Sequence, residues 1–198
     1  MSSMTIADLI SSTQAFEADR KSRSKTPPRT SSAVSIAAKH IGIFKPAAYK
    51  ASDKNSMTRR AVVFTYFAKS DKGRAPEAEW AGSMKGPAGG GDYRVFIFVP
   101  QVNVRPLKTS GRNAMLAKGK YMKPLVEGKT KVKVRCDCSD FRWRFAYYDS
   151  KINALYGAAP PPYVKKSDRP PVNPKGIPGV CKHIMAAFSK MRQEGYLT

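Results

Sequence analysis

Three stretches of the chain carry the apolar patterns of β-strands. Residues 61–68 (AVVFTYFA) and 93–104 (YRVFIFVPQVNV) are rich in β-branched and aromatic side chains, which favours strands. Residues 129–135 (KTKVKVR) alternate, with Val132 and Val134 on one face and basic side chains on the other. This alternation predicts a half-buried strand.

Helical spacing of apolar residues predicts a helix near each end of the chain. Residues 5–19 follow Thr5, a residue type that caps helices, and their apolar face consists of Ile6, Leu9, Ile10 and Phe16. Residues 183–194 (HIMAAFSKMRQE) carry a second apolar face, and Gly195 follows directly. Glycine commonly stands just beyond the end of a helix.

A third helix is predicted over residues 141–156, capped by Ser139 or Asp140 and ended by Gly157. The next 23 residues, 157–179, contain seven prolines. Proline lacks the backbone N–H and fixes φ, so this stretch cannot form a helix or a central strand. It is predicted to be an extended loop that acts as a structural strap or as a recognition element for an aromatic groove.

These elements together predict an α+β fold. We expect a small antiparallel sheet packed with a zinc-anchored two-helix module, plus an extended N-terminal arm. The corresponding domains are residues 1–60 (helix and basic arm), 61–128 (β-rich body) and 129–198 (zinc module with the proline-rich loop). No apolar run approaches the ~18–20 residues that cross a bilayer, and the first twenty residues lack the pattern of a secretory signal.

Charge adds the first functional information. The 198 residues include 36 Lys and Arg against 14 Asp and Glu, a formal net charge of +22. Residues 20–60 alone hold eleven of these basic residues and one acid, Asp53, which is the composition of an extended basic arm or of a solvated flexible tail. The surplus predicts a polyanionic partner, either nucleic acid or an acidic protein surface rather than an anionic membrane. The candidate contact residues are Arg20, Lys21, Arg23, Lys25, Arg29, Arg142, Arg144, Lys165 and Lys166.

The cysteines supply the most specific chemistry. Cys136-x-Cys138 follows a predicted strand, and Cys181-x-His183 opens a predicted helix. Three thiolates and one imidazole are a donor set that tetrahedral Zn²⁺ prefers. The alternative is three buried free cysteines and an unrelated histidine, because cysteine often packs as a small apolar residue. An odd count of three argues against a disulfide framework and for a reducing compartment.

This pattern resembles the SWIM-type zinc finger, in which Cys-x-Cys, a variable spacer and Cys-x-His supply the ligands. The family's surroundings are similar too: a basic-apolar strand before the first cysteine, an aromatic residue (Phe141) soon after the second, and an apolar helix opening at the histidine. The resemblance covers residues 129–195 and implies a structural zinc held by Cys136, Cys138, Cys181 and His183. The chain departs from the family in its spacer, which is 42 residues long. SWIM modules are associated with binding DNA or protein.

A second resemblance concerns the same region. The pieces CDCSDF, ALYG, RPPVNP and PGVCKH look similar to segments of structural proteins encoded by tailed bacteriophages. This resemblance implies a virion protein of the neck, tail or baseplate region, assembled in the host cytoplasm, whose basic arms hold neighbouring chains together. The alternative is a nucleic-acid-binding zinc-finger protein that uses the basic arm and the aromatic-basic helix. We expect neither a membrane nor a small-molecule substrate as partner.

Catalysis is not expected. Four protein ligands leave no open coordination position, which is typical of a structural zinc. The other histidine, His40, lies in the arm, and no third group is evident to orient a Cys181–His183 pair. The sequence also shows no acidic cluster for two-metal chemistry.

Overall fold

The structure is a computed structural model, and it describes residues 3–23, 38–44, 58–69, 92–105, 114–117, 120–162, 164 and 171–198. The helices of this part are α1 (Ile6–Arg23), α2 (Ser139–Phe141), a π-helical turn η2 (Arg142–Ala146), α3 (Tyr147–Lys151) and α4 (Lys182–Gln193). The strands are β1 (Ala38–Phe44), β2 (Thr58–Lys69), β3 (Asp92–Arg105), β4 (Ala114–Ala117), β5 (Lys120–Met122) and β6 (Lys133–Cys136). The predicted α+β class is confirmed.

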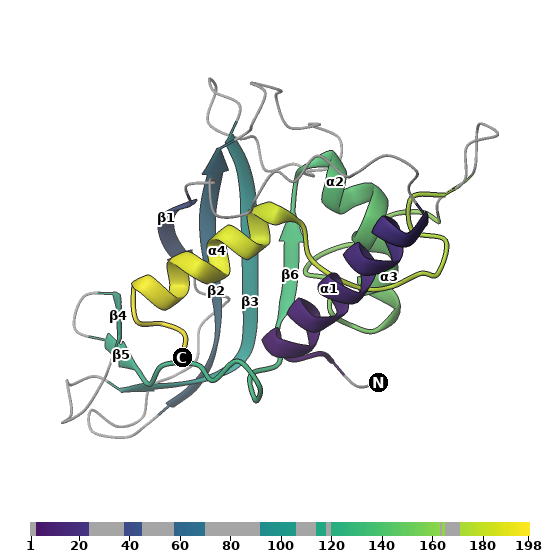
Figure 1. Cartoon of the computed structure of the whole chain (residues 1–198). Coiled ribbons are helices and arrows are strands. Elements are labelled where there is room, and N and C mark those ends of the chain that lie inside the picture. The colour runs from purple at the N-terminus through teal and green to yellow at the C-terminus, as the bar shows by residue number, and fades with distance from the viewer. Residues whose placement is uncertain are drawn as a thin grey trace.

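One antiparallel sheet contains all six of these strands, in the order β1-β2-β3-β5-β4, with β6 also paired to β3 (Figure 1). The long strand β3 pairs with two strands along the same edge. Its residues 95–98 pair with β6, and its residues 104–105 pair with β5. The strands predicted at 61–68 and 93–104 are confirmed. The strand predicted at 129–135 begins later, at Lys133, and runs on to the first cysteine.

Helix α4 packs across β1, β2, β3 and β6 and closes the core on one face of the sheet (Figure 1). Its buried side chains include Ile184, Phe188 and Met191, which are fully inaccessible to solvent. Gly195 has a φ of 75°, the left-handed conformation in which glycine ends a helix, as predicted. Residues beyond the helix return to the body, where Phe64 and Tyr196 pack with ring centroids 5.1 Å apart.

Helix α1 begins as the sequence predicts but ends later. The Thr5 hydroxyl accepts from the Asp8 N–H, and the Asp8 carboxylate accepts from the Thr5 N–H, so the two residues cap the helix reciprocally. Residues 20–23 were expected to start the extended arm and instead form the last helical turn. An Arg23–Asp19 ion pair of 2.8 Å supports this turn, and cations are favourable at a helix C-terminus.

Strand β1 lies within the segment predicted as the basic arm. Its residues 38–44 pair with β2 from Ala38↔Ala68 to Phe44↔Val63. Residues 24–37 and 45–57 lie outside the described residues. The division into three domains therefore stays a prediction, although β1 belongs to the same sheet as the predicted body.

The helix predicted at 141–156 differs from the structure at both ends. It begins at Ser139, and the cap is Cys138, whose Sγ accepts from the Phe141 N–H at 3.3 Å; Ser139 and Asp140 do not cap it. It ends at Lys151, because Asn153 has a φ of 59° and turns the chain back. The returning segment lies against β6, where the Val134 N–H donates to Ala154 O at 2.8 Å. Gly157 therefore does not end this helix.

The described residues of 157–179 form no helix or strand, as the prolines predict. The buried amide of Asn173 holds this loop to the helical segment: Nδ2 donates to Arg144 O at 2.7 Å and to Ile177 O at 2.7 Å. Tyr148 Oη donates to Asn173 O at 3.2 Å. The described residues of the loop are thus tied to η2 and α3 through Asn173. In the described part of the chain, no helix combines the length and apolarity needed to cross a membrane.

Candidate metal centre

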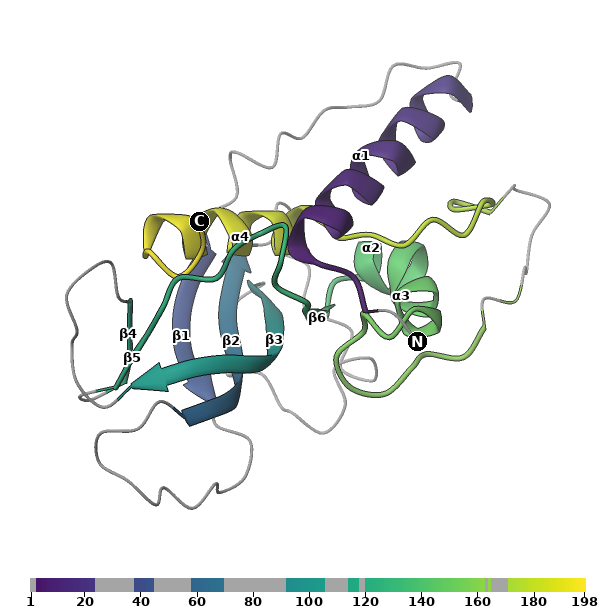
Figure 2. The same cartoon turned by 90° about the horizontal axis from the view of Figure 1, so that it is seen from below.

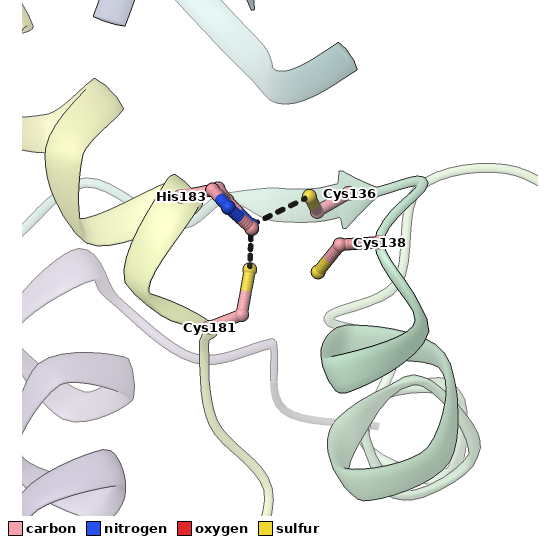
Figure 3. Close-up of side chains that lie close together, drawn as sticks. All are labelled: Cys136, Cys138, Cys181 and His183. Atoms are coloured by element: carbon pink, nitrogen blue, oxygen red, sulfur yellow. Dashed lines mark hydrogen bonds between the residues drawn. The ribbon is translucent and has the colours of Figure 1, made fainter. Parts of the chain in front are cut away.

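Four side chains from three elements converge in the interior (Figure 3). Cys136 ends β6, Cys138 caps α2, Cys181 caps α4 and His183 lies in the first turn of α4. Their ligand atoms all lie within 4.8 Å of one another, and each residue is at most 2% exposed. The predicted ligand set is therefore brought together, and it can hold a metal ion.

The spacing of the donor atoms fits a small tetrahedral ion. His183 Nδ1 lies 3.8 Å from Cys136 Sγ and 3.9 Å from Cys181 Sγ. In a tetrahedral zinc site with Zn–S of ~2.3 Å and Zn–N of ~2.0–2.1 Å, sulfur and nitrogen would be ~3.6 Å apart. All three cysteines are free, so no disulfide competes for the sulfurs.

Burial and hydrogen bonding shift the pKa values of the three thiols in different directions. Burial raises the pKa of Cys136 and of Cys181 well above the ordinary thiol value. Burial also opposes ionisation of Cys138, but hydrogen bonds from Cys136, Cys181 and His183 hold its pKa well below that value. A bound divalent cation would supply the charge compensation that lets all three become thiolates.

His183 presents Nδ1 to the sulfurs, as the dashed contacts in Figure 3 show. Its Nε2 is buried and finds no hydrogen-bond partner among the described residues. The imidazole instead packs against the Tyr93 ring, with centroids 4.6 Å apart. Nδ1 is therefore the atom that would meet a metal ion in this cluster, and packing against Tyr93 orients the ring.

The turn between the first two cysteines is fixed to β3 by a buried ion pair. Asp137 accepts from the Arg94 backbone N–H at 2.7 Å and from Arg94 Nε at 3.1 Å, and the Asp137 N–H donates to Arg94 O at 3.1 Å. One register position along, Cys136 pairs with Val95. This reciprocal set of bonds holds both sulfurs of the Cys-x-Cys turn at the sheet edge.

The second pair of ligands is positioned by residues far away in the sequence. Ser12 Oγ donates to Pro178 O at 2.7 Å, the Gly179 N–H donates to Asp149 Oδ1 at 2.9 Å, and the Val180 N–H donates to Thr13 Oγ1 at 2.8 Å. Helices α1 and α3 thus form hydrogen bonds with each of the three residues before Cys181. Figure 2 shows α1 beside the α2–α3 segment, away from β1 and β2, and Phe16 packs edge-on to Phe145 with centroids 5.0 Å apart.

Sequence reasoning missed these supporting residues. Thr13 and Asp149 lie in predicted helices with no motif to mark them, and their partners in the loop are 167 and 30 residues away. Only Asp137, between two cysteines, and Gly179, in the Pro-Gly-Val-Cys run, stand near the motif.

The five predicted contact residues that the structure describes lie on α1 and η2, which an Arg144–Glu17 ion pair of 3.9 Å joins. Arg20, Lys21 and Arg23 lie in the last turn of α1, where Arg20 pairs with Glu17 at 3.2 Å and Arg23 with Asp19. Arg142 and Arg144 lie in η2, and Arg144 Nε pairs with Asp140 at 2.8 Å. The remaining four, Lys25, Arg29, Lys165 and Lys166, lie outside the described residues.

Comparison with known proteins yields no relative: no family model, curated protein or solved structure matches the chain. The case for a metal centre therefore rests on the geometry of these four residues.

Proposed function

We propose that Cys136, Cys138, Cys181 and His183 bind a structural zinc ion and that the chain is a non-enzymatic structural protein. The observation that carries this proposal is the closed, buried cluster of three sulfurs and one imidazole nitrogen within 4.8 Å. A metal there would tie the end of β6 to the starts of α2 and α4. Zinc is favoured because the donor set is three thiolates and one imidazole.

The arrangement supports a structural rather than a catalytic ion. Four protein ligands fill a tetrahedral shell, so a water or substrate would find no open position. Cys181 is 1% exposed, and burial raises the pKa of its thiol, which is the opposite of an activated nucleophile. The centre therefore contributes folding free energy to the region that it joins.

We further propose that the chain is a subunit of a large assembly, with its basic arm on an acidic surface of a neighbouring chain. Support comes from the net charge of +22 and from the similarity of CDCSDF, ALYG, RPPVNP and PGVCKH to tailed-phage structural proteins. A virion protein of the neck, tail or baseplate region fits both features, and its charge would stay balanced in the particle.

Two experiments test these proposals separately. Metal analysis of the purified chain is expected to give one zinc per molecule, and a protein free of metal, or loaded with another metal, would overturn the zinc assignment. Mass spectrometry of gradient-purified virions of the encoding phage is expected to find the chain at a fixed copy number. Its absence from the particles would overturn the assembly role and leave the metal centre untouched.

A further inference from the structure

The helical segment that follows the Cys-x-Cys turn, residues 139–151, carries both buried and exposed aromatic and charged residues. Arg144 pairs with Asp140 at 2.8 Å, Tyr148 Oη donates to Asn173 O, and Asp149 is fully buried. Asp140 and Asp149 are the two acids of residues 139–151. Asp140 is therefore paired with Arg144, and Asp149 is buried.

The same segment combines an exposed indole with cations stacked on rings. Trp143 is 49% exposed, and the Arg142 guanidinium lies 4.6 Å from the centroid of its ring. Four and eight residues further on are Tyr147 and Lys151, and Lys151 Nζ lies 5.0 Å from the centroid of the Tyr147 ring. Trp143, Tyr147 and Lys151 thus follow one another at a spacing of four residues, with a cation stacked on each of the two rings.

The combination of exposed aromatic rings and cations favours some classes of ligand over others. A base-free anion gains from the cations and gains nothing from an exposed indole. An apolar protein surface would have to desolvate Arg142 and Lys151. A single-stranded polynucleotide uses both features, because every base offers a face for stacking and every phosphate a negative charge. A duplex hides its base faces and would bind through charge alone.

We propose that Arg142, Trp143, Tyr147 and Lys151 form a docking site for a single-stranded polynucleotide without sequence preference. One base stacks on Trp143, the Arg142 guanidinium contributes a cation–π contact, and Lys151 neutralises a phosphate. This site goes beyond the structural role of the metal centre and does not depend on the identity of the ion.

The test measures anisotropy of a fluorescently labelled oligo(dT) titrated with the zinc-loaded full chain. Trp143→Leu is expected to weaken binding about 5- to 150-fold, the range for loss of one base–aromatic stack. The matched control is Val126→Ala, another exposed apolar residue (45%), which is expected to leave the affinity unchanged. Lys151→Gln is expected to weaken binding and flatten its salt dependence, whereas Lys129→Gln makes the same charge change on an exposed loop residue with less effect.

A second readout separates stacking from charge. The chain has two tryptophans, so in a Trp80→Phe background Trp143 is the single indole reporter. Oligo(dT) is expected to quench its fluorescence, and heparin, a polyanion without bases, is not. Equal quenching by heparin, equal affinity of Trp143→Leu and the parent chain, or equal effects of the two lysine variants would each overturn the proposal. None of these outcomes would bear on zinc binding.

Discussion

Gly179 offers a sharp test of how the loop before Cys181 is held. A Cβ added there would lie 2.7 Å from Thr13 Oγ1 and 3.0 Å and 3.2 Å from two carbons of the Phe145 ring. Distances of this kind force the hydroxyl or the ring to move. The Thr13 hydroxyl is the acceptor for the Val180 N–H, so Gly179→Ala strains the packing and also disturbs this hydrogen bond.

The magnitude follows from these two losses. Overpacking a tight interior site costs about 1–3 kcal/mol, and a lost intramolecular hydrogen bond about 0.5–1.5 kcal/mol. Gly179→Ala is therefore expected to lower the free energy of unfolding by roughly 1.5–4.5 kcal/mol. Because Cys181 lies two residues further on, displacement of the loop is also expected to weaken zinc binding.

Urea denaturation of the zinc-loaded protein and competition with a chromophoric chelator measure the two effects. The matched control is Gly128→Ala, since a Cβ at Gly128 meets no atom within 4 Å. This control is expected to unfold like the parent chain and to hold zinc equally well. If Gly179→Ala matches the control in both assays, α1 does not hold the loop before Cys181 in the way described.

Three further substitutions test the supporting contacts. Thr13→Val is expected to lower the free energy of unfolding by about 1–3 kcal/mol, because it leaves the buried Val180 N–H without its acceptor, and Thr13→Ser is expected to restore most of the loss in a urea titration. Burial raises the pKa of Asp149 well above its ordinary value. The protonated carboxyl therefore stabilises the folded state fully only at pH below the unfolded pKa of about 3.9. This contribution is lost as the pH rises through the folded pKa. The stability of the parent chain relative to Asp149→Asn should therefore fall with rising pH in a series of urea titrations, and a constant difference would contradict the burial argument. Asp137→Ala leaves the buried guanidinium of Arg94 uncompensated and is expected to cost about 3–5 kcal/mol, whereas the double variant with Arg94→Leu should recover part of this loss in a double-mutant cycle.

The two long strands and the closing helix were predictable from local pattern. Residues 62–66 of β2 are all buried, and so are Val95, Phe96, Ile97 and Val99 of β3, so propensity and burial agree there. In α4 the apolar face and Gly195 mark both the buried side and the end of the helix. The ligand set was also predictable, because Cys-x-Cys and Cys-x-His are short spacings that place donors together.

The predicted helix boundaries were wrong where a buried residue fits more than one backbone conformation. Leu155 continues the apolar spacing of the helix predicted at 141–156, and it is buried, but in a segment that runs back along β6. The left-handed turn at Asn153 decides this, and a helical pattern drawn through it does not reveal it. Likewise, polar composition alone cannot tell an extended arm from the last turn of α1, which ion pairs and the helix dipole stabilise.

The supporting contacts were beyond prediction for another reason. Thr13 and Asp149 act on the loop before Cys181 through bonds that exist once α1, α3 and this loop have packed together. Each residue type is common in helices, and neither spacing nor charge indicates the distant partner. The fold therefore adds to the sequence motif the residues that hold it in place.

The central claim is a structural metal centre made by Cys136, Cys138, Cys181 and His183, and cobalt substitution tests it most directly. Purified chain, stripped of metal and titrated with Co²⁺, is expected to develop the visible absorption of tetrahedral cobalt with thiolate ligands, saturating at one equivalent and disappearing when one equivalent of Zn²⁺ is added. His183→Ala should weaken this signal and Cys181→Ser should alter its sulfur-to-cobalt charge-transfer component. A spectrum of six-coordinate cobalt, or no saturable binding by the folded chain, would contradict the account.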